Sequence, residues 1–274
     1  MRIVLQNNLV YKNDLKEVQI ACEEAGVEVQ NIKVLPFSED IPEFTYNRNN
    51  IYYGSTTLMY NIYNQLCKPK GLFYNSDTFN MRTYLLRWGD RLLNSSAQLV
   101  RVHFILNEDE YFKYMRPAQK KVAMFEKKYF IRPNGDGKEF DGQVGTYQEI
   151  KEMLERYVQY DNRLDEDSEV LIGPAYNIYK EWRLYIVGGK IITASRYRKD
   201  FKLSKSSEDI PESMINFAEE CIASYKPHEN FALDICNTHD GEYYIIEAGC
   251  LNSVGFYHCD INKLFKAIIT WMKN

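Results

Sequence analysis

The hydrophobic pattern at the start of the chain alternates short apolar runs with an amphipathic stretch. Arg2–Leu5 is a short apolar run that predicts a strand, and the apolar positions over 15–22 recur at helical spacing. Gly26 predicts the end of this helix, because glycine readily adopts the left-handed conformation found there. Strands are predicted over 27–35 and 51–53, the second running into a further helical pattern. This alternation of strands and helices predicts a parallel sheet.

The rest of the chain continues to mix the two periodicities, which predicts an α/β fold. The apolar stretch over 99–106 fits a strand and a helix equally well, so its type stays open. The other expected elements are a helix over 78–88, a strand at 129–131, a helix over 146–160, a strand at 170–172 that ends at Gly173-Pro174, strands over 182–187 and 190–196, a helix over 211–225, strands over 231–236 and 243–247, and a final helix over 261–272.

Composition and charge narrow the class of protein. The 274 residues carry 34 basic and 38 acidic side chains, a formal charge of −4, which disfavours a dedicated duplex-DNA binder. No apolar run approaches the ~20 residues of a membrane span, and the first run is too short for a signal peptide. Six cysteines without a C-x-x-C pair indicate reduced thiols. We therefore expect a cytoplasmic protein without a membrane partner, and the many tyrosines and asparagines suggest a phage or low-GC bacterial origin, in the phage case acting in the host cytoplasm.

A hairpin near the C-terminus carries the most informative chemistry. Asp240-Gly241 is a preferred two-residue turn, which would place Asp234 directly opposite Glu247 with Cβ atoms ~5 Å apart. Two carboxylates so close repel each other unless a cation lies between them or one is protonated. The pair is a candidate Mg²⁺ site. Two solvated carboxylates on an exposed face are the equally weighted alternative.

A glycine-rich segment over 132–142 is a candidate phosphate-binding loop. Its glycines permit close approach of the backbone to a ligand, and Arg132 and Lys138 add positive charge. It lacks the G-x-x-x-x-G-K-[ST] pattern of a P-loop. Taken alone, an ordinary surface turn is the favoured interpretation.

The strands on either side of Gly188-Gly189 carry further charges. Strict alternation places Glu181 and Arg183 on one face of the first strand, and Arg196 and Arg198 on one face of the second. Cross-strand salt bridges on a solvated sheet are the alternative to a binding site.

In this order the features resemble the ATP-grasp superfamily. Arg132-Pro133 resembles its phosphate-contacting strand, and the segment from Gly135 to Gly142 resembles its loop over the phosphates. The family's final Asn ligand, two residues after Glu247, is replaced here by Gly249, and Asn252 is the nearest substitute. The resemblance implies the following roles: phosphate binding by Arg132 and Lys138, adenine binding at Ile172, ribose binding by Glu181, stabilisation of the migrating phosphoryl group by Arg183, Arg196 and Arg198, and metal binding by Asp234, Glu247 and Asn252.

The resemblance also implies an organisation and an activity. We expect an N-terminal α/β domain over 1–115, a small ATP-grasp lobe over 116–185 and a large lobe over 186–274. The implied activity is an ATP- and Mg²⁺-dependent ligase that joins a small-molecule or peptide carboxylate to an amine or thiol through an acyl phosphate. Two alternatives stay open. One is a nucleotide-binding interaction protein without turnover, and the other is a nucleic-acid end-processing or ligating enzyme, permitted by the lysines over 120–128 but disfavoured by the net charge.

Overall fold

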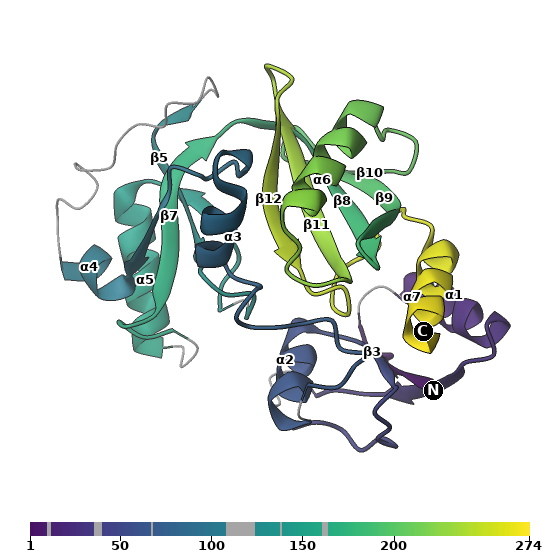
Figure 1. The fold of residues 1–274 in the computed structure, drawn as a ribbon. Helices are drawn as coiled ribbons and strands as arrows, with labels where there is room; N and C mark the ends of the chain where they lie inside the picture. The colour runs from purple at the N-terminus through teal and green to yellow at the C-terminus, as the bar shows by residue number, and fades with distance from the viewer. Residues whose placement is uncertain (10–11, 36–39, 67, 108–123, 138, 161–163) are drawn as a thin grey trace.

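The computed structural model describes residues 1–9, 12–35, 40–66, 68–107, 124–137, 139–160 and 164–274. Its described strands form three sheets, each covered by helices (Figure 1). None of the described helices is long and apolar enough to cross a lipid bilayer.

The N-terminal sheet is parallel, as the sequence pattern predicts. Its strands, in spatial order, are β2 (Glu28–Ile32), β1 (Arg2–Gln6) and β3 (Ile51–Tyr53). Helix α1 (Lys12–Glu24) joins β1 to β2, and α2 (Thr56–Gln65) follows β3. The hydroxyl of Ser55 caps α2 by accepting the amide hydrogen of Leu58.

The second sheet is antiparallel and forms the small lobe. Its strands, in spatial order, are β4 (Gln98–Arg101), β7 (Glu169–Tyr176), β5 (Met124–Pro133) and β6 (Gln143–Gly145). Helices α4 (Val102–Asn107) and α5 (Tyr147–Tyr160) share an apolar core with this sheet. The ambiguous stretch over 99–106 is therefore a strand that turns directly into a helix. Strand β7 also runs past Gly173-Pro174, where the sequence pattern predicted its end.

The third sheet is antiparallel and forms the large lobe. Its strands, in spatial order, are β10 (Lys202–Ser206), β9 (Lys190–Lys199), β8 (Ile178–Val187), β11 (Phe231–Thr238) and β12 (Tyr243–Gly249). The predicted hairpin turn between β8 and β9 is confirmed, since Gly188 and Gly189 have φ angles of +59° and +73°.

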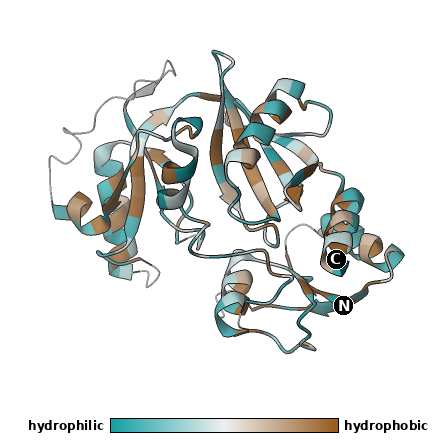
Figure 2. Ribbon diagram, viewed as in Figure 1, coloured by the Kyte–Doolittle hydropathy of each residue, from teal (hydrophilic) through white to brown (hydrophobic). Residues whose placement is uncertain are grey.

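The alternation of side chains divides the core of the large lobe into two layers. Leu184, Ile186 and Leu233 face the helices α3 (Met81–Trp88) and α6 (Glu212–Ser224). Tyr185 and Ala232 face the other way, into a core shared with α1 and the C-terminal helix α7 (Ile261–Lys273). Helix α7 lies beside α1, so the two ends of the chain are close together (Figure 1). Hydrophobic residues run along β7 and β11 (Figure 2).

The sheets divide the chain at different points from those predicted. Strand β4 belongs to the small-lobe sheet although it precedes residue 116, because it pairs with β7. Strand β8 belongs wholly to the large-lobe sheet although most of it precedes residue 186. The chain therefore passes from the small-lobe sheet to the large-lobe sheet at Asn177, between β7 and β8, and we call this point the hinge.

Candidate functional site

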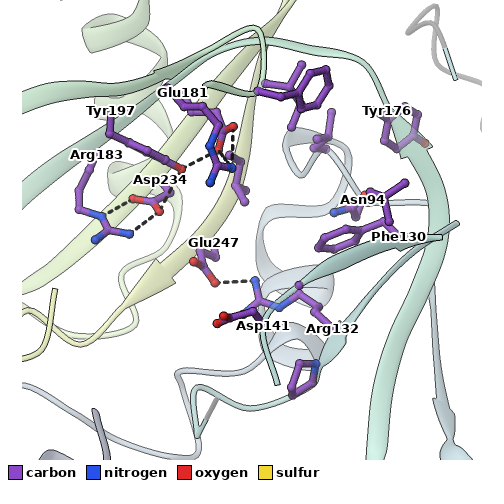
Figure 3. Close-up of a pocket in the computed structure, with 18 of the residues that line it drawn as sticks. Asn94, Phe130, Arg132, Asp141, Tyr176, Glu181, Arg183, Tyr197, Asp234 and Glu247 are labelled. Atoms are coloured by element: carbon purple, nitrogen blue, oxygen red, sulfur yellow. Dashed lines mark hydrogen bonds and ion pairs between the residues drawn. The ribbon is translucent and has the colours of Figure 1, made fainter. Parts of the chain in front are cut away.

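A cleft of about 340 Å³ lies between the small and large lobes, beside the hinge. Apolar side chains line one end of it, namely Leu93, Phe130, Tyr176, Ile178 and Ile246. Charged side chains line the rest, including Arg132, Glu181, Arg183, Arg198, Asp234 and Glu247 (Figure 3). The cleft thus has an apolar end and a charged end, which suits a ligand with a flat apolar part and an anionic part.

The hairpin that carries the two carboxylates closes differently from the prediction. Thr238, rather than His239, pairs with Glu242, and its amide donates to the carbonyl of Glu242 over 3.2 Å. Gly241 has a φ of +88°, and its amide donates to the carbonyl of Thr238 over 2.9 Å. The turn is therefore a three-residue loop with glycine in a left-handed position, instead of the two-residue turn expected at Asp240-Gly241.

A bulge compensates for the longer turn. Ile235 pairs with Ile245, but the next residue, Asp234, pairs with Glu247, so Ile246 is the extra residue on β12. Asp234 and Glu247 are therefore directly opposite each other, as predicted, although for a different reason. The bulge also turns two consecutive residues, Ile246 and Glu247, toward the cleft.

Each of the two carboxylates is bound to an arginine. The guanidinium of Arg183 donates two hydrogen bonds to Asp234, both of 2.7 Å, from the neighbouring strand β8. The Nη1 atom of Arg132, on β5 of the other lobe, lies 2.5 Å from Oε2 of Glu247. The arginines thus neutralise the repulsion that was expected to require a cation or a proton (Figure 3).

The electrostatic surroundings hold both guanidinium groups in their charged form. Burial alone would lower the pKa of Arg183, but Asp234 outweighs it and raises that pKa well above its ordinary value. Burial would likewise lower the pKa of Arg132, but Glu247 outweighs this effect and raises that pKa above its ordinary value. The charged end of the cleft therefore holds fixed positive charge that can pair with anionic groups.

Glu181 lies on the same face of the large-lobe sheet as Arg183 and Asp234, and it is 4% exposed. Its carboxylate accepts a hydrogen bond of 2.7 Å from Tyr197 and one of 3.1 Å from Arg198. Burial raises the pKa of Glu181 above its ordinary value, an effect that Arg198 partly offsets.

Sequence comparison identifies the family. A profile described as the ATP-grasp domain, R2K clade family 3, matches residues 92–268. The chain belongs to the ATP-grasp family. The match begins before β4, in agreement with the place of that strand in the small-lobe sheet. ATP-grasp proteins are generally ligases that use ATP, so the chain falls in this class at the level of the family.

Solved ATP-grasp structures share the fold over nearly the whole chain. D-cycloserine synthetase DcsG is 13% identical, with a TM-score of 0.62 and coverage of 98% of this chain and 99% of that one. The D-alanine–D-alanine ligase from Bacillus anthracis, solved with ATP, is 16% identical, with a TM-score of 0.60 and coverage of 100% and 97%. The ATP-grasp ligase PsnB, solved with its precursor peptide PsnA2 and AMPPNP, is 10% identical, with a TM-score of 0.53 and coverage of 98% and 96%. No curated protein matches the chain in sequence.

Arg196 does not reach the cleft, contrary to the prediction that it shares a face with Arg198. Glu181 pairs with Arg198 but Trp182 pairs with Arg196, so a bulge makes Tyr197 an extra residue on β9. Tyr197 and Arg198 consequently both line the cleft. The guanidinium of Arg196 points away and binds Asp209 and the carbonyl of Ser204.

Ile172 is a core residue of the small lobe and not a cleft residue. Its side chain is fully buried in the core shared with α4 and α5. The ATP-grasp cleft is lined instead by Tyr176 and Ile178, on either side of the hinge. Ile172 lies four residues before Tyr176 within the same strand, because β7 continues beyond Gly173-Pro174.

Asn252 holds the N-terminal domain and is absent from the cleft lining. Its carboxamide nitrogen donates to the carbonyls of Tyr52 and Gly71, over 2.6 and 2.9 Å, and its oxygen accepts the amide hydrogen of Phe73 over 2.7 Å. The structure therefore gives Asn252 a role in joining domains, and its donors and acceptor are used there. Within the described part of the chain, no group of three or more His, Cys, Asp or Glu side chains is arranged to hold a metal.

Parts of the predicted phosphate loop are described and parts are not. Gly135, Asp136 and Gly142 line the cleft, whereas Lys138 lies outside the described residues. The lysines at 120 and 121, which had permitted a nucleic-acid function, also lie outside them.

Two aromatic residues complete the charged end and were missed by the sequence analysis. The rings of Tyr197 and Tyr257 stack 4.8 Å apart, and the guanidinium of Arg183 lies 5.7 Å and 5.3 Å from their centres. Tyr257 has a φ of +54°, which is uncommon for a tyrosine. The stack orients Arg183, and no local pattern could have indicated it, since the two tyrosines are distant in sequence.

Proposed function

We propose that the chain is an ATP- and Mg²⁺-dependent ligase that joins a carboxylate to an amine or thiol through an acyl phosphate. The observation that carries the proposal is the pair Asp234 and Glu247, directly opposite each other in the interlobe cleft, with an arginine on each. This arrangement offers both the anionic ligands of a hard cation and the cations that bind phosphate.

The chemistry of the donors fits Mg²⁺ without a third protein ligand. Magnesium is bound in many nucleotide enzymes by one or two carboxylates together with substrate phosphates and water. Asp234 and Glu247 would hold the ion, and the role in domain contact found for Asn252 removes it from the proposed ligand set. When bound, the ion would supply neutralisation of phosphate charge.

The residues of the cleft divide the remaining work. Arg132 and Arg183 would pair with the phosphates. Arg198, which is held by its contact with Glu181, would orient the leaving phosphate or the attacking amine or thiol. In the first step a carboxylate oxygen of the substrate bonds to the γ-phosphorus and the bond to the β–γ bridging oxygen breaks, releasing ADP. In the second, the amine or thiol bonds to the acyl carbon and gives up a proton to the leaving phosphate or to solvent, and inorganic phosphate leaves. Such chemistry depends on position and charge rather than on a covalent nucleophile.

The similar structures indicate a broad class of substrate for the proposed ligase. One similar structure is a ligase of D-alanine and another binds a precursor peptide. A small-molecule or peptide carboxylate and an amine acceptor are therefore the proposed substrates.

One observation favours a second function, a nucleotide-binding protein without turnover. Gly249 stands where the family pattern has an asparagine, and Asn252 is turned to the N-terminal domain. The metal would then be held by fewer protein oxygens than in a typical member.

Hydroxylamine trapping separates the two functions. The purified chain is incubated with MgATP, hydroxylamine and pools of amino acids or peptides, and both ADP and hydroxamate are measured. The ligase predicts that the two products form together with at least one pool, that Arg183→Lys lowers both, and that Arg196→Lys, outside the cleft, retains both. MgATP binding without ADP or hydroxamate from any pool would support the protein without turnover.

A further inference from the structure

Asn94 is a buried polar residue that the proposed chemistry does not use. It is 5% exposed and lines the cleft, and its side chain has no hydrogen-bond partner among the described residues. Its carboxamide atoms are not among the described side-chain atoms that are fully buried without a partner, and the residue lines the cleft. Its unused donor and acceptor are therefore available to a ligand.

The segment that carries Asn94 is held from both lobes. On the large-lobe side, Leu92 bridges Ile245 and the amide of Leu93 donates to the carbonyl of Ile245 over 2.9 Å. On the small-lobe side, the hydroxyl of Ser96 lies 3.1 Å from that of Tyr176, next to the hinge. These contacts fix the segment where β7 ends and β12 faces the cleft.

Close packing behind the segment restricts it further. A Cβ atom on Gly173 would lie 2.5 Å from the Cβ of Ala97, so β7 approaches the segment more closely than any other residue type would allow. The main chain around Asn94 is therefore positioned before a ligand enters, which favours specific recognition over adaptable contact.

The neighbours of Asn94 indicate which part of a ligand it meets. Asn94 lies beside Phe130 and Tyr176, at the apolar end of the cleft, away from Arg183 and Asp234 (Figure 3). If the charged end receives the triphosphate, as the proposed function requires, the apolar end receives the base.

We propose that Asn94 is the residue that selects adenine. A carboxamide matches the edge of adenine, since its N–H can donate to N7 while its oxygen accepts from the N6 amino group. Guanine and hypoxanthine carry an acceptor oxygen at the same position, which leaves the carboxamide oxygen facing another acceptor. The inference rests on the proposed nucleotide site but not on turnover.

Titration of the full chain with nucleotide analogues tests the assignment. ATP is compared with inosine triphosphate, which has an oxygen in place of the N6 amino group, and with 7-deaza-ATP, which lacks N7, all with Mg²⁺. The wild-type chain is expected to bind each analogue about tenfold more weakly than ATP. Asn94→Ala is expected to bind ATP about tenfold more weakly and to lose most of the discrimination. Asn31→Ala, which changes an exposed residue of strand β2, should behave like the wild type.

A second variant keeps the test independent of any effect of alanine on folding. Asn94→Asp retains an acceptor but loses the donor, so it should still prefer ATP over inosine triphosphate while no longer preferring ATP over 7-deaza-ATP. Equal discrimination by the wild type and both variants, with ATP bound, would overturn the role of Asn94 and leave the proposed function standing. Absence of MgATP binding to the wild-type chain would overturn both.

Discussion

The two arginine–carboxylate pairs of the cleft differ in how the fold holds them. Arg183 and Asp234 are register partners on adjacent strands of one sheet, with side chains 14% and 5% exposed. Arg132 and Glu247 come from different lobes, and Glu247 is 29% exposed. The first pair is set by strand register, whereas the second forms only when the lobes are close together.

Pairing within one sheet and pairing across the cleft have different consequences for stability and for ligand binding. A pair on adjacent strands stays side by side while the sheet is intact, so removal of one partner leaves the other charge buried. A pair across a cleft can separate as the lobes move, and water can then solvate both groups. The interlobe pair is therefore the one better suited to exchange partners when nucleotide enters.

The largest effect is expected from breaking the pair within the sheet. Arg183→Met should lower the free energy of unfolding by about 3–5 kcal/mol, because Asp234 is left buried without its partner. The double variant Arg183→Met, Asp234→Asn should regain much of that loss, since no charge is then unpaired. Urea unfolding measures both, and equal losses in the single and double variants would contradict this account.

A smaller effect is expected from breaking the interlobe pair. Arg132→Met should lower the free energy of unfolding by about 1–3 kcal/mol, because Glu247 can be hydrated once the arginine is gone. This prediction replaces the expectation from sequence that Arg132 lies in a surface loop. The same urea experiment checks it, and a loss as large as that of Arg183→Met would show that the two pairs are not held differently.

The pH dependence of stability should report the burial of Glu181. Burial raises the pKa of Glu181 in the folded state above its ordinary value of 4.5. Between pH 4.5 and the raised pKa of Glu181, the folded protein binds more protons than the unfolded chain. The free energy of unfolding therefore falls as pH rises through this range. Glu181→Gln cannot titrate. The stability of the wild type minus that of the variant should therefore fall over this window in urea melts, and a difference that rises with pH would show the opposite shift.

The smallest effect is expected at Arg198, whose side chain is 47% exposed. Arg198→Ala should change the free energy of unfolding by only about 1 kcal/mol, because the arginine is half-exposed and the buried Glu181 keeps its hydrogen bond from Tyr197. Its affinity for MgATP should nevertheless fall, whereas Arg196→Lys, which points away from the cleft, should bind MgATP like the wild type. Calorimetric titration compares the two, and a fall in affinity confined to Arg196→Lys would reverse the assignment of faces.

Although the pairing of Asp234 with Glu247 was predicted, it also required the bulge at Ile246. The sequence by itself determined the order of the main elements and the parallel N-terminal sheet. These depend on local periodicity and on a short connection, where few residues separate the partners. The resemblance to the ATP-grasp family could likewise be read from the spacing of Arg132-Pro133, Glu181, Asp234 and Glu247 along the chain.

Only the tertiary structure decided which of the remaining residues reach the cleft. The bulges at Tyr197 and Ile246 reverse the alternation of side chains, and a bulge depends on how one strand fits its partner rather than on the strand's own sequence. Asn252 and the segment that carries Asn94 contact parts of the chain far away in sequence, so their places follow from packing between lobes and domains. Hydrogen-bond partners at such separations leave no periodic signal, because the contact is created by the fold itself.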